Sequence, residues 1–286
     1  MPNFGTNKLN LDRICLIKIQ RQKMEKILTI AGSDCSGGAG IQADIKTITA
    51  HKMYAMSVIT ALTAQNTTGV FGVFETPSEF VEAQIKACFD DIVPNAVKIG
   101  MVSNKEIIKS IAKMLKFYKA KNIVVDPVMV ATSGGVLMKN DAVNSLINEL
   151  FPIASVITPN LSEAEVLSEM KIKNINDMKK SAQKIAKLTN GAVLVKGGHL
   201  GKEAVDILYE NGEFSEFSAP KIDTKNSHGT GCTLSSAIAC GLGANLNLQQ
   251  AVKNAKEFVF NALSWSEQIG HGNGPIDHYF RIEKIF

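Results

Sequence analysis

The chain has 286 residues, of which 45% are hydrophobic and 20% are charged. This length and composition suffice to bury one large core, so we expect a single folded domain. The formal net charge of +4 comes from residues 1–23, which hold five basic residues and one acidic residue. The rest of the chain is balanced in charge, which argues against a nucleic-acid partner because a phosphate backbone attracts a basic surface.

Residues 1–23 mix basic and isolated apolar positions without a stable period, and Met24 opens a more regular segment. We expect residues 1–23 to be a disordered extension or a non-native start, and residues 24–286 to form the functional domain. A basic targeting or membrane-surface arm is the alternative. No apolar run reaches the length of a membrane span, and the five cysteines lack a Cys-x-x-Cys pair. These features predict a cytoplasmic protein without a membrane partner.

From Lys26 onward, short apolar runs of strand type alternate with patterns of helical spacing. Strands are expected at 26–30, 54–62, 96–100, 122–128, 155–159 and 192–198. Helices are expected at 40–53, 77–89, 106–118, 141–151, 175–188 and 248–262. This alternation predicts a three-layer α/β fold with a mostly parallel central sheet and helices on both faces. Within 204–220, Asn211-Gly212 favours positive φ and predicts a β-hairpin at the sheet edge.

The first loop of interest is the segment 31–40, AGSDCSGGAG, between a predicted strand and a predicted helix. Ligands of open parallel sheets bind beyond the carboxyl ends of the strands, and four glycines let this backbone approach a ligand closely. The loop lacks the Gly-Lys-Ser/Thr ending of a Walker A loop and the spacing of a dinucleotide fingerprint. A glycine-rich turn without a ligand role is the alternative. The glycine-bearing segment 131–135 is a candidate lid.

The second loop leads into a helix through Gly229, Thr230, Gly231 and Cys232. Free N–H groups at a helix N-terminus, together with the positive end of the helix dipole, make an anion site suited to a phosphoryl group in transfer. The same field favours the thiolate of Cys232, which would allow it to act as a base. The alternative is that Cys232 is a small apolar residue in helix packing.

A third group of polar residues lies at other predicted strand ends. Asn160 and Glu163 share the first turn of a predicted helix, where they can hold the water shell of Mg²⁺ or form a helix cap. Lys196 ends a strand before two glycines, so its ammonium is free to reach a nucleotide phosphate or to remain in solvent. Asp126 closes another strand, where it can support a metal or serve as a turn residue before Pro127.

Seven motifs in this order are similar to those of one enzyme family. They are LTIAGSDCSGGAGIQADIKT, SVITALTAQNT, KIGM, VVDPVM, ITPNLSEAE, LVKGGH and SHGTGCTLSSAIA. From Lys26 to about Ile276 the chain resembles the hydroxymethylpyrimidine and phosphomethylpyrimidine kinases of thiamine biosynthesis, within the ribokinase superfamily. The resemblance implies a ribokinase-like fold, the substrates ATP and an aminopyrimidine, Mg²⁺ as cofactor, and a homodimer.

The resemblance also implies roles for single residues. Gly229 to Cys232 would form the anion hole, with Cys232 as the base and Thr230 also near the nucleotide. Asn160 and Lys196 would contact the nucleotide, and Glu163 and Asp126 would lie near the metal. The pyrimidine pocket would be lined by Gln65, Gly32, Asp44, Met101 and Val128. The Gln65 amide offers both a donor and an acceptor, which complements an aminopyrimidine edge.

Two other functions remain open at this point. Pyridoxal also carries a hydroxymethyl group on an aromatic ring, and some relatives with this scaffold phosphorylate it. Gln65 favours the pyrimidine, because relatives dedicated to pyridoxal tend to lack glutamine there. A catalytically silent regulator that binds a nucleotide or vitamer is the second rival, although a binding module does not need Cys232, Lys196 and Glu163 together.

Overall fold

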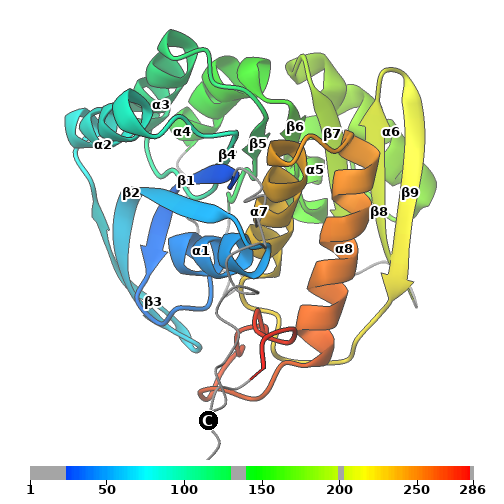
Figure 1. Cartoon of the computed structure of the whole chain (residues 1–286). Coiled ribbons are helices and arrows are strands. Elements are labelled where there is room, and N and C mark those ends of the chain that lie inside the picture. Colours follow the sequence, from blue (N-terminus) through cyan, green and yellow to red (C-terminus); the bar gives the residue numbers. More distant parts are fainter. Residues whose placement is uncertain (1–23, 130–139, 199–202, 284–286) are drawn as a thin grey trace, which may run out of the picture.

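The computed structural model describes residues 24–129, 140–198 and 203–283 (Figure 1). The extension 1–23 and the candidate lid 131–135 therefore lie outside the described residues. The strands are β1 (Lys26–Asp34), β2 (Tyr54–Asn66), β3 (Gly69–Glu75), β4 (Ala96–Ile99), β5 (Ile123–Val125), β6 (Val156–Ile157), β7 (Ala192–Gly197), β8 (Glu203–Glu210) and β9 (Glu213–Pro220). The helices are α1 (Gly40–Ala50), α2 (Ser78–Asp91), α3 (Lys105–Phe117), α4 (Asn140–Ser145), α5 (Leu161–Ser168), α6 (Ile175–Ile185), α7 (Thr230–Gly243) and α8 (Leu248–Ser264).

The strands of the described chain form one sheet in the order β3-β2-β1-β4-β5-β6-β7-β8-β9. The central run from β2 through β1 to β7 pairs in parallel, and β3, β8 and β9 add antiparallel pairs at the two edges. The predicted mostly parallel sheet is therefore confirmed. The hairpin is also confirmed, because β8 and β9 meet at Asn211 and Gly212, which both have positive φ. None of the described helices has the length and apolar character that a bilayer crossing requires.

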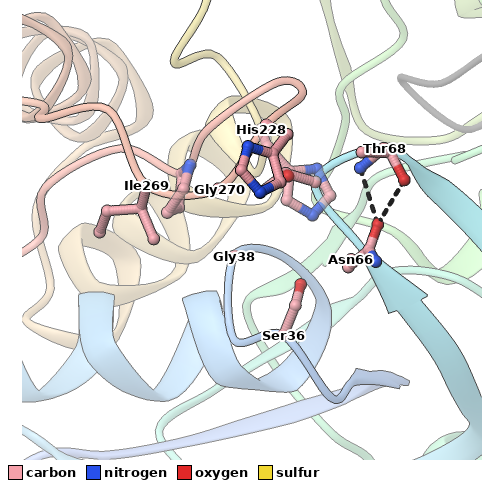
Figure 2. A pocket seen from close by; sticks show the side chains of 10 residues that line it. Ser36, Gly38, Asn66, Thr68, His228, Ile269 and Gly270 are labelled. Carbon is pink, nitrogen blue, oxygen red and sulfur yellow. Dashed lines mark hydrogen bonds between the residues drawn. The ribbon is translucent and has the colours of Figure 1, made fainter.

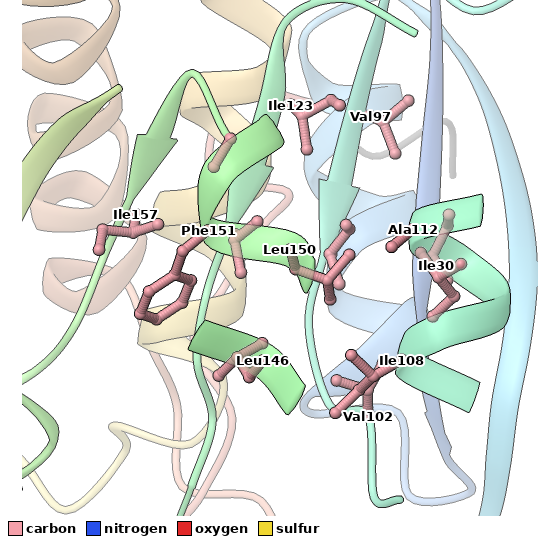
Figure 3. Close-up of a cluster of buried hydrophobic side chains, with 14 of the residues drawn as sticks. Ile30, Val97, Val102, Ile108, Ala112, Ile123, Leu146, Leu150, Phe151 and Ile157 are labelled. Carbon is pink, nitrogen blue, oxygen red and sulfur yellow. The ribbon is translucent and has the colours of Figure 1, made fainter. Parts of the chain in front are cut away.

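Helices cover both faces of the sheet, because successive strand residues point to opposite sides. In β1, Ile27 faces a core shared with α1, α7 and α8, whereas Leu28 and Ile30 face a core shared with α2 to α6. In β5, Val124 faces the same core as Ile27, whereas Ile123 and Val125 face the same core as Leu28 and Ile30. Figure 3 shows part of the second core, where Phe151 and Leu150 pack toward the sheet. The three-layer prediction is confirmed.

Two elements differ from the sequence-based expectation. The expected helix 141–151 is regular only in α4, and it continues as a π-helical turn at Leu146–Leu150 and a 3₁₀ turn at Phe151–Ile153. Pro152 lacks an N–H group and cannot continue a regular helix. Strand β3 is additional to the expected strands. Its large apolar side chains are exposed, Phe71 and Phe74 by 70% each, so the sequence has no buried alternation to signal it.

A fully buried ion pair joins β4 to α1. The Lys98 ammonium lies 2.9 and 2.8 Å from the two carboxylate oxygens of Asp44, which also accept hydrogen bonds from Thr29 at 2.5 Å and Ser236 at 2.7 Å. Burial opposes the charge on Lys98, but the Asp44 carboxylate, together with Cys232 and Asp126, outweighs the effect of burial and raises the pKa of Lys98. Lys98 is therefore charged at neutral pH, and the pair ties the sheet to α1 and α7.

Replacing Lys98 by Met leaves the Asp44 charge buried without its counter-ion, which costs about 3–5 kcal/mol in the free energy of unfolding. Urea unfolding followed by circular dichroism measures this loss. The control is Lys113→Met, which breaks an exposed pair with Glu82 and changes stability by less than about 1 kcal/mol. Equal effects of the two substitutions would contradict the role assigned to the buried pair.

Candidate active site

Two glycine-bearing loops touch at the carboxyl ends of the parallel strands. One is the loop 34–40 between β1 and α1, and the other is the turn 227–229 before α7. Gly229 has a φ of +86°, and a Cβ atom there would overlap the carbonyl oxygen of Gly38. A Cβ atom at Gly38 would in turn overlap the ring of His228. Because neither position has room for a side chain, the two loops form one continuous backbone surface.

The head of α7 supplies free donors to this surface. Gly229 makes no side-chain cap, and within the described chain the N–H groups of Gly231 and Cys232 have no acceptor. Thr230 differs from the expectation, because its N–H donates to the Ser227 carbonyl at 3.3 Å and its hydroxyl donates to the same oxygen at 2.7 Å. Thr230 therefore shapes the turn, and the open amides of Gly231 and Cys232 that follow it are donors of the kind that can bind an anion.

An ion pair faces these amides across the site. Lys196, near the end of β7, lies 2.7 Å from the carboxylate of Asp126, and a Cβ atom on Gly231 would be 3.4 Å from Asp126 Oδ2 and 3.5 Å from Lys196 Nζ. Burial opposes the lysine charge, but the carboxylates of Asp126 and Glu163 outweigh it and raise the pKa of Lys196. A permanent positive charge thus lies beside the free amides, where an anion would bind.

Asn160 and Glu163 form the helix cap that the sequence allowed as one alternative. The Asn160 side chain accepts from the N–H of Glu163 at 3.0 Å, and the Glu163 carboxylate accepts from the N–H of Asn160 at 2.9 Å and of Met129 at 3.1 Å. Burial raises the pKa of Glu163, and Lys196 opposes that shift. The cap fixes the carboxylate next to the Asp126–Lys196 pair.

The two carboxylates of Asp126 and Glu163 are compatible with a Mg²⁺ ion that is held through water. A carboxylate has about four lone-pair sites, so Glu163 and Asp126 keep acceptor capacity beyond the bonds above. Among the described residues, no three His, Cys, Asp or Glu side chains surround one point. An all-protein metal cage is therefore absent from the described chain, whereas Mg²⁺ ordinarily keeps several waters and uses one or two carboxylates plus substrate phosphates.

Cys232 differs from the expectation of a favoured thiolate. The side chain is partly exposed, yet burial of its surroundings raises the pKa of the thiol, and the charge of Lys98 and the N–H of Gly40 offset this only in part. The sequence shows the helix terminus but not the low-polarity surroundings, which disfavour the charged form. The resting side chain is therefore a thiol at neutral pH.

Asp44 also differs from its expected place. Its side chain has no exposed surface, and its oxygens are occupied by Lys98, Thr29 and Ser236. Ser236 lies one helical turn after Cys232 on α7, so the Asp44–Lys98 pair lies beneath Cys232. Asp44 therefore supports the floor of the site and does not line the surface that a ligand touches.

The remaining expected pocket residues lie near the carboxyl ends of β1, β2, β4 and β5. A Cβ atom on Gly32 would lie 3.1 Å from Met101 Sδ, so these two residues adjoin. Gln65, at the end of β2, is half-buried beside Cys35, whose thiol donates to the Gln65 carbonyl at 3.2 Å. Val128 has a φ of +42°, an unusual conformation for a β-branched residue that is typical of functional sites.

Three residues that the sequence analysis did not single out hold this site together: Lys98, Asp34 and His228. The ring of His228 lies 2.9 Å from the Asp34 carboxylate, and this pair joins the two loops. The loops also border a cavity of about 200 Å³, where Ser36, Gly38 and His228 lie opposite Asn66 and Thr68 (Figure 2). All three residues lie inside the seven motifs given above. A short stretch of sequence does not show, however, which residues of distant segments will pair with each other.

The chain is similar to known proteins across the segments that form this site. A family model described as phosphomethylpyrimidine kinase matches residues 34–277. The hydroxymethylpyrimidine/phosphomethylpyrimidine kinase of Rhizobium meliloti is 50% identical over 258 residues, which cover 89% of this chain and 97% of the relative. The match thus spans both loops, the ion pairs and α7.

Two solved structures share the fold. The phosphomethylpyrimidine kinase of Clostridium difficile is 49% identical, with a TM-score of 0.75, and covers 83% of this chain and 99% of its own. The pyridoxal kinase of Bacillus subtilis, solved as an ADP complex, is 37% identical, with a TM-score of 0.84, and covers 91% of this chain and 99% of its own. The ribokinase-like α/β expectation is confirmed, and the chain belongs to the phosphomethylpyrimidine kinase family.

Proposed function

We propose that this chain uses ATP to phosphorylate the hydroxymethyl group of hydroxymethylpyrimidine, and then phosphorylates the resulting monophosphate to the diphosphate, in thiamine biosynthesis. One observation carries the proposal. The free amides of Gly231 and Cys232 lie beside the Lys196–Asp126 pair, and Gln65 lies near the end of β2, at the same carboxyl edge of the sheet. Such a site provides positive potential for a phosphoryl group and an amide for a pyrimidine edge.

Phosphoryl transfer asks mainly for positioning and charge stabilisation. Lys196 holds the nucleotide phosphates, and the amides at the head of α7 stabilise the charge that spreads over the transferred group. The β-bridge between Asn160 and Lys196 supports assigning Asn160 to the nucleotide together with Lys196. Asp126 and Glu163 would hold Mg²⁺ through water, and the ion would supply charge neutralisation at the phosphates.

The two phosphorylations place different demands on Cys232. The first acceptor is a neutral hydroxyl, so its proton must leave, and the thiolate of Cys232, which is the minor form at neutral pH, is the base. The second acceptor is a phosphate monoester, which is already largely ionised at neutral pH because its second pKa is about 6. The second step therefore needs the amides and Lys196 but little or no base.

The homodimer also enters as part of this proposal. The β2–β3 ribbon lies at an open edge of the sheet and exposes Leu62 by 49% and Phe71 and Phe74 by 70% each. Contiguous exposed apolar side chains are typical of surfaces that bind another protein. A second copy of this chain, paired through that ribbon, fits the open strand edge.

The function is tested with purified protein, ATP and Mg²⁺ against hydroxymethylpyrimidine, its monophosphate and pyridoxal. We expect ATP consumption with both pyrimidines and a lower kcat/KM for pyridoxal, because Gln65 complements the pyrimidine edge. Pyridoxal stays in the panel because of the fold shared with the Bacillus subtilis enzyme. Preference for pyridoxal would make this a vitamin B6 kinase, and binding without turnover would make it a silent regulator.

Cys232→Ala is expected to lower kcat for the first phosphorylation by about 10²–10⁴-fold and to change the second by less than about tenfold. Because burial raises the thiol pKa, the wild-type first-step rate rises with pH as the thiolate forms and is still rising above the ordinary cysteine pKa of about 8.5, and this rise is absent in the variant. Separate assays with the two pyrimidines measure both effects. Cys88→Ala, on α2, is the control, and equal losses in both steps would refute the division of labour.

A further inference from the structure

We propose that Lys256 keeps the Lys196 ammonium turned toward the nucleotide phosphates, by occupying the Asp206 carboxylate that would otherwise draw Lys196 away. The inference rests on the proposed function and deepens it, because it names a residue that determines how the site holds ATP. Lys256 is then a positioning residue, since it acts through Lys196 and not on the reacting atoms.

Lys196 has a carboxylate on each side of it in the sheet. On one side is Asp126, which directly follows β5 and lies 2.7 Å from the Lys196 ammonium. On the other side is Asp206 of β8, which is the direct antiparallel partner of Lys196. Side chains of directly opposed residues share one face of a sheet, and their Cβ atoms are about 4.5–5.5 Å apart. The flexible stem of a lysine can therefore reach either carboxylate.

The face that Lys196 and Asp206 share is the one covered by α7 and α8. Leu194 and Leu208, each two residues away along β7 and β8, pack in the core that these helices form with the sheet. Because side chains alternate along a strand, Lys196 and Asp206 point to the same side as these leucines. Lys256 belongs to α8, so it approaches Asp206 from the side on which Lys196 also lies.

The Asp206 carboxylate is fully engaged by Lys256 and the backbone. One oxygen accepts from the Lys256 ammonium at 2.7 Å, and the other accepts from the N–H of Gly197 at 3.0 Å. The two charged side chains are nearly enclosed, with 11% of Lys256 and 7% of Asp206 exposed. A buried ion pair adds little net stability, because desolvation offsets the attraction between the charges. Stability alone therefore does not account for this pair.

Removing the Lys256 charge would leave Asp206 as a buried carboxylate without its counter-ion. An unpaired buried charge is strongly unfavourable, and Lys196, directly opposite on β7, is a cation that can neutralise it. Lys196 would then turn from Asp126 toward Asp206, away from the free amides of α7. The nucleotide phosphates would lose a positive partner, whereas Gln65, at the end of β2, would keep its place.

The test measures KM for ATP, and the Kd of a non-hydrolysable ATP analogue by isothermal titration calorimetry. Lys256→Met is expected to raise both constants by at least about tenfold, and to lower kcat by the same factor in both phosphorylations. KM for hydroxymethylpyrimidine should not change. Asp206→Asn keeps an acceptor for the Gly197 N–H but removes the competing charge, so both constants should stay at their wild-type values. Each substitution leaves one buried charge unpaired, so a purely structural role would give the two similar effects.

Three further variants complete the test. The double variant Lys256→Met with Asp206→Asn carries neither charge and should regain the wild-type KM for ATP, which a double-mutant cycle measures. Lys253→Met is the matched control, because Lys253 lies on the same helix but is exposed, and neither constant should change. If circular dichroism shows that Lys256→Met does not fold, Lys256→Gln replaces it. The amide of that variant can still donate to Asp206, and the same direction of change is expected.

Wild-type constants in the folded Lys256 variant, an equal rise of KM for ATP in Asp206→Asn, or a double variant that binds ATP as weakly as Lys256→Met would overturn the inference. These outcomes are separate from failure of the proposed function. If the wild-type enzyme phosphorylates neither pyrimidine, the proposed function fails, and the analogue titration still tests the role of Lys256. If the wild-type enzyme is active and Lys256→Met binds the analogue normally, only the role of Lys256 fails.

Discussion

The architecture of the site depends on the close approach of two backbone segments, at Gly38 and Gly229. This contact places the first glycine loop against the head of α7, so a ligand held by one loop lies within reach of the free amides of the other. The parallel sheet makes the contact possible because β1 and its neighbours deliver their carboxyl ends to the same edge. The pocket, the anion site and Cys232 all take their positions from it.

Two buried ion pairs make the electrostatics of the site permanent. Lys98 with Asp44 lies beneath Cys232, and Lys196 with Asp126 lies beside the amides of α7. In both pairs the carboxylate raises the pKa of its lysine. Positive charge is therefore already oriented before a phosphoryl group arrives, so little reorganisation is needed when charge develops during transfer. The same burial raises the pKa of Cys232.

Much of the fold could be predicted from the sequence because its signals are local. Strand periodicity, the Asn211-Gly212 turn and the order of strands and helices each depend on neighbouring residues. Strand β3 has no such signal because its apolar side chains are exposed. The end of the helix after α4 does have a local signal in Pro152, but the helical spacing of 141–151 does not show where the π-helical turn begins.

The site, like the fold, has some features that the sequence shows and others that it does not. The glycine-rich loops, Asn160 with Glu163, and Lys196 could be identified from their places at predicted strand ends. The sequence could not show that Asp44 is enclosed by Lys98, which is 54 positions away, or that burial outweighs the helix terminus at Cys232. It also could not show the bond between Asp34 and His228, which are 194 positions apart. Long-range pairing and desolvation appear only once the chain is folded.

The most direct measurement is kcat for both phosphorylations in Gly229→Ala, beside Gly212→Ala as the matched control. Both glycines have nearly the same positive φ, but only Gly229 lies against another backbone, whereas Gly212 faces open space. If the contact between the loops organises transfer, Gly229→Ala lowers kcat in both steps by at least about 10²–10³-fold in a folded protein, and Gly212→Ala does not. A folded Gly229→Ala enzyme with wild-type kcat would contradict the account.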